Sequence, residues 1–333
     1  MTPTPFNNRV PPFLFYKGRG EDEEENEVLF AIEHIPVLQK EVINYLCPKK
    51  EGIYIDATLG GGGHSALIAS YLGKRGKIFG IDQDAQALKK AKVKLAKYGD
   101  KISYSHGNFR NLDKIILKFN IEKVDGILLD LGVSTEQLEN PERGFSFSEN
   151  LNAPLDMRMD LSQKLTAYDV VNEYPEEKIR EILYKLGEES YAKKIARRIV
   201  SKRKIKLIKT TGDLIELIRE STPPKYRFSR KGHWASKVFR AIRMEVNQEL
   251  PALEQALPKA VAGLKSGGRL VIISFHSLED RIVKRTFKEM SQPGENKKPL
   301  VRLLTKKPIM ASPAEIEKNP KADSAKLRAV EKL

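Results

Sequence analysis

Hydrophobic positions change their spacing at Ile53, where short apolar runs begin to alternate with longer amphipathic ones. Within 84–98, Leu88, Ala91 and Leu95 fall on one helical face with lysines elsewhere, as a helix that covers a sheet requires. Strands alternating with helices predict a parallel sheet with right-handed crossovers. We therefore predict helices at 65–72 and 84–98, and strands at 53–58, 77–82, 101–107 and 124–132, the last nearly all apolar and buried on both faces.

The alternation stops after about Gln137, and helical patterns prevail up to about Lys231. A helical pattern at 248–264 and an apolar run at 267–275 then restore the earlier rhythm. This order favours a doubly wound α/β domain, formed by 34–137 and 231–333, that a helical insertion at 138–230 interrupts. Residues 1–33 combine a proline-rich stretch with an acidic run, so we expect a disordered acidic extension there.

Length and composition exclude several classes of protein. The chain has 333 residues, of which 40% are hydrophobic, as in a globular protein of about two domains. No apolar stretch approaches the ~18 residues that a membrane span needs, and the first residues lack the pattern of a secretion signal. Cys47 is the only thiol and cannot form an internal disulfide, so we expect a cytoplasmic location.

The charge is strongly positive and unevenly distributed. Lysine and arginine total 59 against 44 acidic residues, a net charge of +15. Residues 1–33 hold seven acids and three bases, a net −4, so the remaining chain carries 56 bases and 37 acids, a net +19. A basic body of this kind attracts nucleic acid, although general solubility charge is the alternative.

Four successive glycines, Gly60 to Gly63, lie where the first strand ends and the first crossover helix begins. Glycine permits positive φ and a close approach of backbone to a ligand, and ligands of open α/β sheets bind at this carboxyl edge. Asp82 ends the second strand, where a carboxylate can accept hydrogen bonds from both ribose hydroxyls. The combination predicts a site for a nucleoside cofactor.

Several nucleoside cofactors stay open at this point. Gly61, Gly63 and Ala66 fit a dinucleotide fingerprint weakly, and no P-loop sequence is present. Asp56, at the start of the loop, is unfavourable beside a pyrophosphate but suits the cationic sulfonium or amino group of S-adenosylmethionine. That favours a methyl donor.

Eight segments along the chain carry a recognisable pattern: HIPVLQKEV (34–42), DATLGGGGHS (56–65), GIDQD (80–84), GNFRNLD (107–113), GILLDLGVSTEQL (126–138), RGFSF (143–147), PLDMRMD (154–160) and GGRLVIISFHSLEDRIVK (267–284). Together they closely resemble the bacterial RsmH (MraW) family, S-adenosylmethionine-dependent methyltransferases that act on the N4 amine of a cytidine in the decoding region of 16S ribosomal RNA. The resemblance covers residues 34 to 330 and implies a Rossmann-like class I methyltransferase domain.

The resemblance also implies which residues hold the cofactor. Asp82 would bind the ribose and Phe109 would pack by the adenine; the full implied set is Gly62, Gly63, His64, Asp82, Phe109, Asp130 and Gln137. The chain departs from the family pattern at 233–237, His-Trp-Ala-Ser-Lys in place of His-Pro-Ala-Thr-Arg, and at 321–323, where the family is arginine-rich. Both departures concern RNA contact and not the cofactor loop.

Methyl transfer to an amine needs positioning of the acceptor nitrogen and an acceptor for its N–H groups more than strong base catalysis. Asp130 and Ser134, just after the fourth strand, are candidates to orient the amine, with a cofactor contact or strand cap as the alternative for Asp130 and a turn or N-cap for Ser134. Asp156 is a third candidate, with an internal salt bridge as its alternative. Carbon methylation needs a cysteine nucleophile, and Cys47 precedes the first strand, where we expect a buried helix residue.

We expect no metal. His276, Glu279 and Asp280 lie close in sequence, but the chain has no recognised paired-ligand spacing, and methyl transfer needs no Lewis acid. We expect His276 to lie near the RNA or to cap the next helix.

Two basic runs make the helical insertion the candidate for RNA recognition. Residues 193–209 contain nine bases and no acid, although a solvated helix face is the alternative. Residues 225–243 contain seven bases and no acid, interleaved with aromatics, some of which, Phe239 above all, we expect in the core. Basic groups contact phosphate and aromatic rings stack on unpaired bases. The expected partner is 16S rRNA or the small ribosomal subunit, bound by a monomer or a homodimer.

Two rival functions remain on the residues alone. One is methylation of another amine, such as adenine N6. The other is a nucleic-acid-binding assembly factor with a vestigial cofactor pocket.

Overall fold

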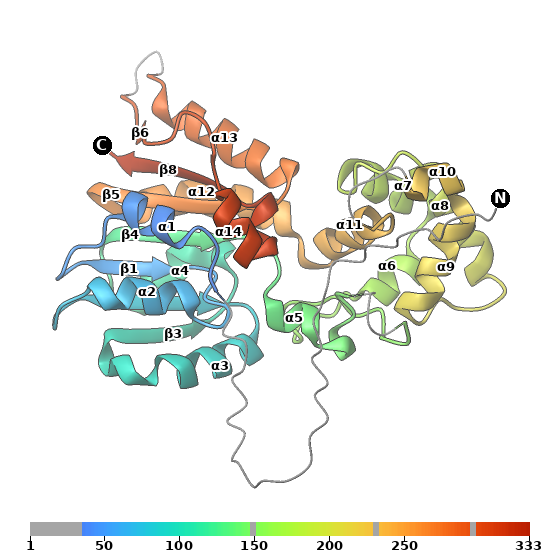
Figure 1. Cartoon of the computed structure of the whole chain (residues 1–333), viewed down its shortest axis with the longest axis horizontal. Coiled ribbons are helices and arrows are strands. Elements are labelled where there is room, and N and C mark those ends of the chain that lie inside the picture. Colours follow the sequence, from blue (N-terminus) through green and yellow to red (C-terminus); the bar gives the residue numbers. More distant parts are fainter. Residues whose placement is uncertain (1–34, 147–150, 229–232, 294–297) are drawn as a thin grey trace, which may run out of the picture. The chain divides into compact units, whose positions relative to one another are not determined.

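The computed structural model describes residues 35–146, 151–228, 233–293 and 298–333. A mixed eight-stranded sheet has the order β3-β2-β1-β4-β5-β8-β6, with β7 paired to β8 (Figure 1). The first five strands are mutually parallel, and β8 runs antiparallel to its neighbours. The strands are β1 (Ile53–Asp56), β2 (Lys77–Asp82), β3 (Ile102–His106), β4 (Val124–Asp130), β5 (Leu264–Ser274), β6 (Val301–Leu303), β7 (Ile309–Met310) and β8 (Lys326–Lys332). The predicted α/β class is confirmed.

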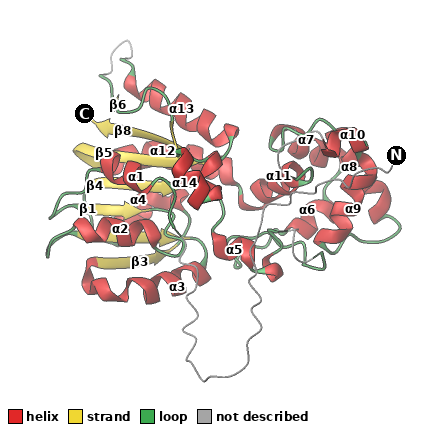
Figure 2. Ribbon diagram, viewed as in Figure 1, coloured by secondary structure: helices red, strands yellow, loops and turns green. Residues whose placement is uncertain are grey.

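Helices cover both faces of this sheet (Figure 2). Successive strand residues point to opposite faces, so Leu128 packs into one core and Ile127 and Leu129 into the other. The first core includes side chains of α1 (Gln39–Leu46), α2 (Gly63–Tyr71) and α3 (Ala85–Leu95). The second includes side chains of α4 (Leu112–Lys118), α12 (Glu249–Gly263) and α13 (Ser277–Ser291). This is the doubly wound arrangement that the strand pattern predicts.

A separate core unites the helices of the middle of the chain. The predicted boundary of the insertion at 230 stays a prediction, and side chains of α11, among them Val238 and Ile242, also belong to this helical core. Between β4 and this region lies the short helix α5 (Thr135–Glu139). The helices of the region are α6 (Ala167–Glu173), α7 (Glu176–Lys185), α8 (Ala192–Arg203), α9 (Thr211–Ser221), α10 (Pro224–Phe228) and α11 (Ser236–Asn247).

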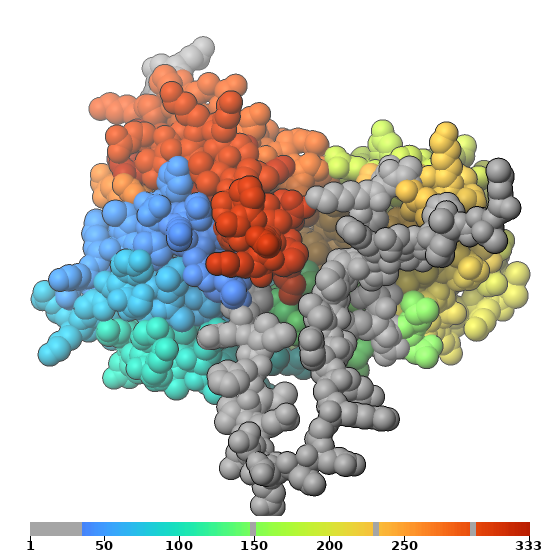
Figure 3. All heavy atoms as spheres, in the orientation of Figure 1, coloured from blue at the N-terminus to red at the C-terminus, as the bar shows by residue number. Residues whose placement is uncertain are grey.

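The C-terminal segment returns to the beginning of the described chain. In helix α14 (Pro313–Lys318), Glu315 accepts the N–H of Leu38 at 2.6 Å, and Asn319 beyond it donates to the carbonyl of Ile35 at 2.9 Å. Figure 3 shows this red segment beside the blue one. The first of these segments along the chain lies next to the glycine loop, because a Cβ on Gly63 would lie 2.5 Å from Pro36.

Some sequence-based predictions concern residues that the structure does not describe, and the prediction for Cys47 is wrong. The predicted extension 1–33, Phe147 of the RGFSF segment and residues 229–232 of the second basic run lie outside the described residues. The expectation that Cys47 is buried is wrong: it is exposed and caps α1 with a φ of 51°, because the helix ends before it. Within the described residues, no helix combines the length and the apolar composition that a bilayer crossing requires.

Candidate functional site

The glycine loop forms a tight connection between β1 and α2. Gly60 and Gly62 have φ of 51° and 81°, a region that side chains with a Cβ disfavour. A Cβ on Gly62 would also lie 2.7 Å from the Leu95 side chain of α3. The sequence therefore needs glycine here for conformation and for packing.

Asp82 holds the loop from the end of the neighbouring strand. One carboxylate oxygen accepts the N–H of Gly60 at 2.7 Å, and the other accepts the N–H of Asp84 at 2.8 Å. Burial nevertheless raises the pKa of Asp82 to about 6. Asp82 as a residue is partly exposed, and the carboxylate lone pairs that these two N–H groups leave free can accept hydrogen bonds from a ligand.

Asp56 lies beneath the loop and not on its surface. It is fully buried, accepts the hydroxyl of Ser65 at 2.7 Å and the N–H of Thr58 at 3.3 Å, and burial raises its pKa. An ionised Asp56 would act on a cationic ligand through its field and not by contact. The sequence argument had placed this acid beside the ligand.

His64 and Asp130 meet at the carboxyl edge of the sheet. Nε2 of His64 lies 3.5 Å from Oδ2 of Asp130, and the N–H of Asp130 donates to the hydroxyl of Thr58 at 2.6 Å. Both ring nitrogens of His64 and Oδ1 of Asp130 are buried atoms that have no hydrogen-bond partner among the described residues. Buried polar groups are rarely left unpaired unless a ligand, ion or water completes them. The cluster therefore points to a polar ligand at this edge.

The other implied cofactor residues differ in how much of the side chain is free for a ligand. Phe109 is partly exposed and packs against the second sheet core. Gln137 is 5% exposed, and its amide accepts the N–H of Ser134 at 3.0 Å and donates to Asp84 at 2.9 Å. The amide of Gln137 is therefore used in contacts within the protein, and it positions Asp84 and Ser134 instead of facing a ligand.

The alternatives for Ser134 and Asp156 are both present in the structure. Ser134 is the N-cap of α5, in a reciprocal capping box with Gln137. Asp156 pairs with Arg158 through both carboxylate oxygens, at 2.9 and 2.7 Å. Of the three candidates for orienting the amine, Asp130 alone has a carboxylate oxygen that is buried and unpaired among the described residues.

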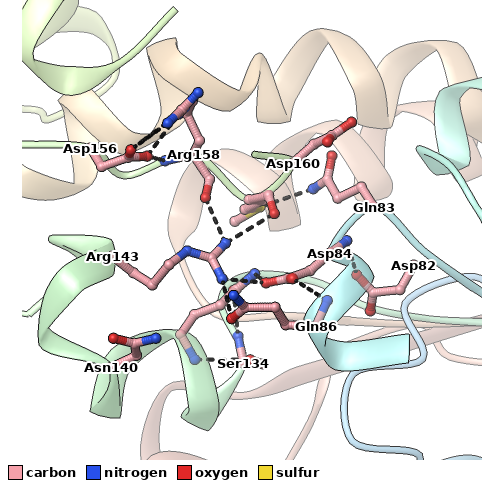
Figure 4. Close-up of polar contacts among 12 residues, drawn as sticks. Asp82, Gln83, Asp84, Gln86, Ser134, Asn140, Arg143, Asp156, Arg158 and Asp160 are labelled. Carbon is pink, nitrogen blue, oxygen red and sulfur yellow. Dashed lines mark hydrogen bonds and ion pairs between the residues drawn. The ribbon is translucent and has the colours of Figure 1, made fainter. Parts of the chain in front are cut away.

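Sequence reasoning missed a buried ion pair at Asp84, in the turn that follows Asp82 at the end of β2. Arg143 is 4% and Asp84 3% exposed, and NH1 of Arg143 lies 2.9 Å from Oδ2 of Asp84 (Figure 4). The segments RGFSF and GIDQD that contain these residues were recognised as family motifs. Their contact joins positions 59 residues apart, and no local pattern reveals it.

A second buried charge cluster lies after β5. Ligand atoms of Glu249, His276 and Glu279 lie within 4.8 Å of one another. Arg243 already pairs with both carboxylate oxygens of Glu249, at 2.8 and 2.9 Å. Burial alone would raise the pKa of Glu279, but His276 and a backbone N–H lower it overall. The arrangement is one of compensated charges, and a cation there would compete with Arg243.

His276 is the N-cap of α13, as one of its two predicted roles requires. Asp280, the third residue of the metal reading, pairs instead with Arg328 at 2.6 Å.

The two basic runs differ in how they are exposed. On α8 the side chains of Lys193, Lys194 and Arg197 are exposed. In the second run Tyr226 and Phe239 are buried in the helical part, as expected for Phe239, whereas Phe228 is 85% exposed. The aromatic rings of this run therefore do not form one stacking surface.

Comparisons with known proteins identify relatives over most of the chain. The family model described as the MraW methylase family matches residues 31–333. "Ribosomal RNA small subunit methyltransferase H" of Clostridium botulinum is 49% identical over 310 residues, which cover 90% of this chain and 99% of that protein. The protein of the same name from Carboxydothermus hydrogenoformans is 49% identical over 310 residues, 90% of this chain and 98% of its own. A solved structure of an rRNA methylase from Streptococcus thermophilus aligns over 89% of this chain and 93% of its own, with 14% identity and a TM-score of 0.40.

Proposed function

The chain belongs to the MraW methylase family, and from this premise we propose that it transfers a methyl group from S-adenosylmethionine to N4 of a cytidine in the decoding region of 16S ribosomal RNA. The observation that carries the proposal is the set of unpaired buried atoms of His64 and Asp130 beside the glycine loop. Relatives named as small-subunit rRNA methyltransferases support the class of substrate. A cytoplasmic location accompanies this substrate and stays a prediction.

The residues at the edge of the sheet fit this donor. Asp82 and Phe109 are both partly exposed; the carboxylate of Asp82 would accept the two ribose hydroxyls, and the ring of Phe109 would pack by the adenine. His64 and Asp130 offer polar atoms for the methionine end, above the buried acid Asp56. Bound there, S-adenosylmethionine supplies an electrophilic methyl group. These assignments are part of the proposal.

Asp130 is the proposed orienting group for the acceptor. The Asp130 side chain is 24% exposed, and its carboxylate can accept an N–H of the cytosine amine. This contact turns the nitrogen lone pair away from the ring and toward the donor. The nitrogen must lie about 3 Å from the methyl carbon for transfer. Ser134 and Asp156 stay candidates of lower rank, because the cap and the salt bridge already use their oxygens. The amine proton is released after transfer, when the nitrogen is more acidic.

RNA binding is proposed for the exposed face of α8. Lys193, Lys194 and Arg197 are exposed there, and such a group of cations contacts phosphates without reading sequence. A target base must leave its stack before its amine can reach a methyl donor.

The experiment supplies labelled donor to the protein with unmodified small subunits, with naked rRNA and with DNA, followed by digestion to nucleosides. Label on N4-methylcytidine from rRNA or subunits is the expected result. Label on adenine, or only in DNA, would replace the proposal with the rival amine methyltransferase. Calorimetric titration with S-adenosylmethionine tests the other rival, since absence of binding up to millimolar donor favours an assembly factor.

A further inference from the structure

Arg143 joins two segments that flank the donor site. It ends a short turn after α5, and its side chain is buried. Figure 4 shows its guanidinium between Asp84 and the main chain of Arg158. One terminal nitrogen contacts Asp84, and the other donates to the main-chain carbonyls of Arg158 and Met159 at 2.8 and 3.1 Å. A planar guanidinium can satisfy both directions at once, which a lysine ammonium on a flexible stem cannot do in the same geometry.

On the donor side, the contact reaches Asp82 through one residue. Asp84 donates its N–H to Oδ1 of Asp82 at 2.8 Å, and its carboxylate caps α3 by accepting the N–H of Gln86 at 2.9 Å. Gln137 donates to the same carboxylate oxygen of Asp84 that Arg143 approaches. The Asp84 carboxylate is therefore held from three directions, whereas Asp84 contacts Asp82 through its main-chain N–H, which no side-chain substitution removes.

On the other side, the contact holds the segment 156–160. Asn247, at the end of α11, accepts the N–H of Met159 at 2.7 Å and donates to the carbonyl of Met157 at 2.8 Å. Met157 has a φ of 59°, a conformation that a side chain with a Cβ adopts only when surrounding contacts hold it. Asn247 and the main-chain carbonyl of Arg143, which accepts the N–H of Met157 at 2.9 Å, supply those contacts, and the Arg143 side chain holds the two residues that follow. Without the Arg143 side chain the segment keeps its link to α11 and the contact of Gln83 Nε2 with the sulfur of Met159 at 2.9 Å, but it loses the charged link to Asp84.

We infer that Arg143 is a positioning residue that sets the distance between the ribose-binding turn and the segment 156–160. The inference rests on the proposed function, because it gives this distance a role in placing the cytidine against the methyl donor. Arg143 itself touches neither donor nor base in this account. Loss of the link would displace the acceptor side while leaving the donor-binding groups intact, and a displacement of ~1 Å costs roughly a hundredfold in rate.

The test compares Arg143→Lys and Asp84→Asn with wild type. Lysine keeps the charge but loses the planar fork. Asparagine keeps the cap of α3 and the main-chain N–H to Asp82, and removes the charge that faces Arg143. Arg75→Lys is the matched control, because the Arg75 side chain is 86% exposed and, in the described part of the chain, forms its ion pair with Glu51 on the surface. Each variant is measured for kcat, for KM of donor and of rRNA, and for hydrogen exchange in peptides that cover 155–161.

The expected result for both variants is a kcat lowered ~10- to 100-fold, a donor KM within ~3-fold of wild type, and faster exchange in 155–161 while the strands keep their protection. Arg75→Lys should match wild type in all of these. The inference is overturned if both variants keep kcat within twofold and exchange in 155–161 is unchanged. It is also overturned if donor KM rises as much as kcat falls, because that pattern indicates a general loss of the donor site. Failure of the proposed function is a separate result, since it appears as absence of N4-methylcytidine with the wild-type protein, and the exchange measurement does not depend on it.

Discussion

Replacing Asp82 by asparagine tests the ribose-binding role at constant size. A hydrogen bond to a charged carboxylate contributes ~1.5–3 kcal/mol, against ~0.5–1.5 kcal/mol for a neutral acceptor. Two ribose hydroxyls therefore lose ~2–3 kcal/mol together, which raises the donor dissociation constant roughly 30- to 150-fold. We expect this loss at pH 8, where the Asp82 carboxylate, with a pKa of about 6, is ionised.

The same change should leave the folded protein nearly as stable as before. Asparagine has one oxygen for the N–H groups of Gly60 and Asp84, which Asp82 now satisfies with two, and an unmet N–H costs ~1–3 kcal/mol. Removing the charge offsets this, because burial raises the pKa from 3.8 to about 6, equivalent to ~3 kcal/mol against the ionised form. The free energy of unfolding should change by less than ~2 kcal/mol.

The assay is calorimetric titration with S-adenosylhomocysteine, alongside urea unfolding of the same samples. Asp100→Asn is the matched control, because Asp100 is exposed and lies in the turn before β3, away from the strand ends that form the site. A change in dissociation constant below ~3-fold for Asp82→Asn, in a protein that unfolds like wild type, would refute the ribose assignment. A large loss of stability would instead show that the loop contacts of Asp82 outweigh its desolvation.

Three further results follow from the site and the basic surface. The affinity of the wild type for S-adenosylhomocysteine should fall as pH drops from 7 to 5. Burial raises the pKa of Asp82 to about 6, so the carboxylate gains a proton in this range and accepts hydrogen bonds less strongly. Titrations at each pH should find no such fall in Asp82→Asn. Gly62→Ala should lower the free energy of unfolding, measured in urea, by ~2–3 kcal/mol, because it adds ~1–2 kcal/mol of backbone strain and places a Cβ 2.7 Å from a leucine of α3. Gly60→Ala should cost only the strain, because a Cβ there would have nothing within 4 Å. Equal losses for the two variants would contradict the packing argument. Exchanging Lys193 and Arg197 for glutamine should weaken rRNA binding and reduce the salt slope by about 1.5, measured by filter binding at several salt concentrations; an unchanged slope, or an equal effect from two exposed lysines of α3, would exclude α8 as the RNA surface.

Much of the sheet could be predicted from the sequence because its determinants are local. The strand predicted at 77–82 has those bounds, and the helix predicted at 84–98 spans Ala85–Leu95. Strand alternation and helical spacing are visible within a dozen residues. The short strands β6 and β7 escaped prediction because they have three and two residues and pair only with β8.

The sequence by itself determined the α/β class, the glycine loop, the acid at the end of the second strand and, through eight motifs, the family. The tertiary structure decided which polar groups are used in contacts within the protein and which are left to bind a ligand. It places Asp56 under the loop, commits Gln137 and Asp156 to internal contacts, and leaves atoms of His64 and Asp130 unpaired. The physical reason is that hydrogen bonding and burial depend on the register between distant segments, and a sequence pattern records only the propensities of neighbours.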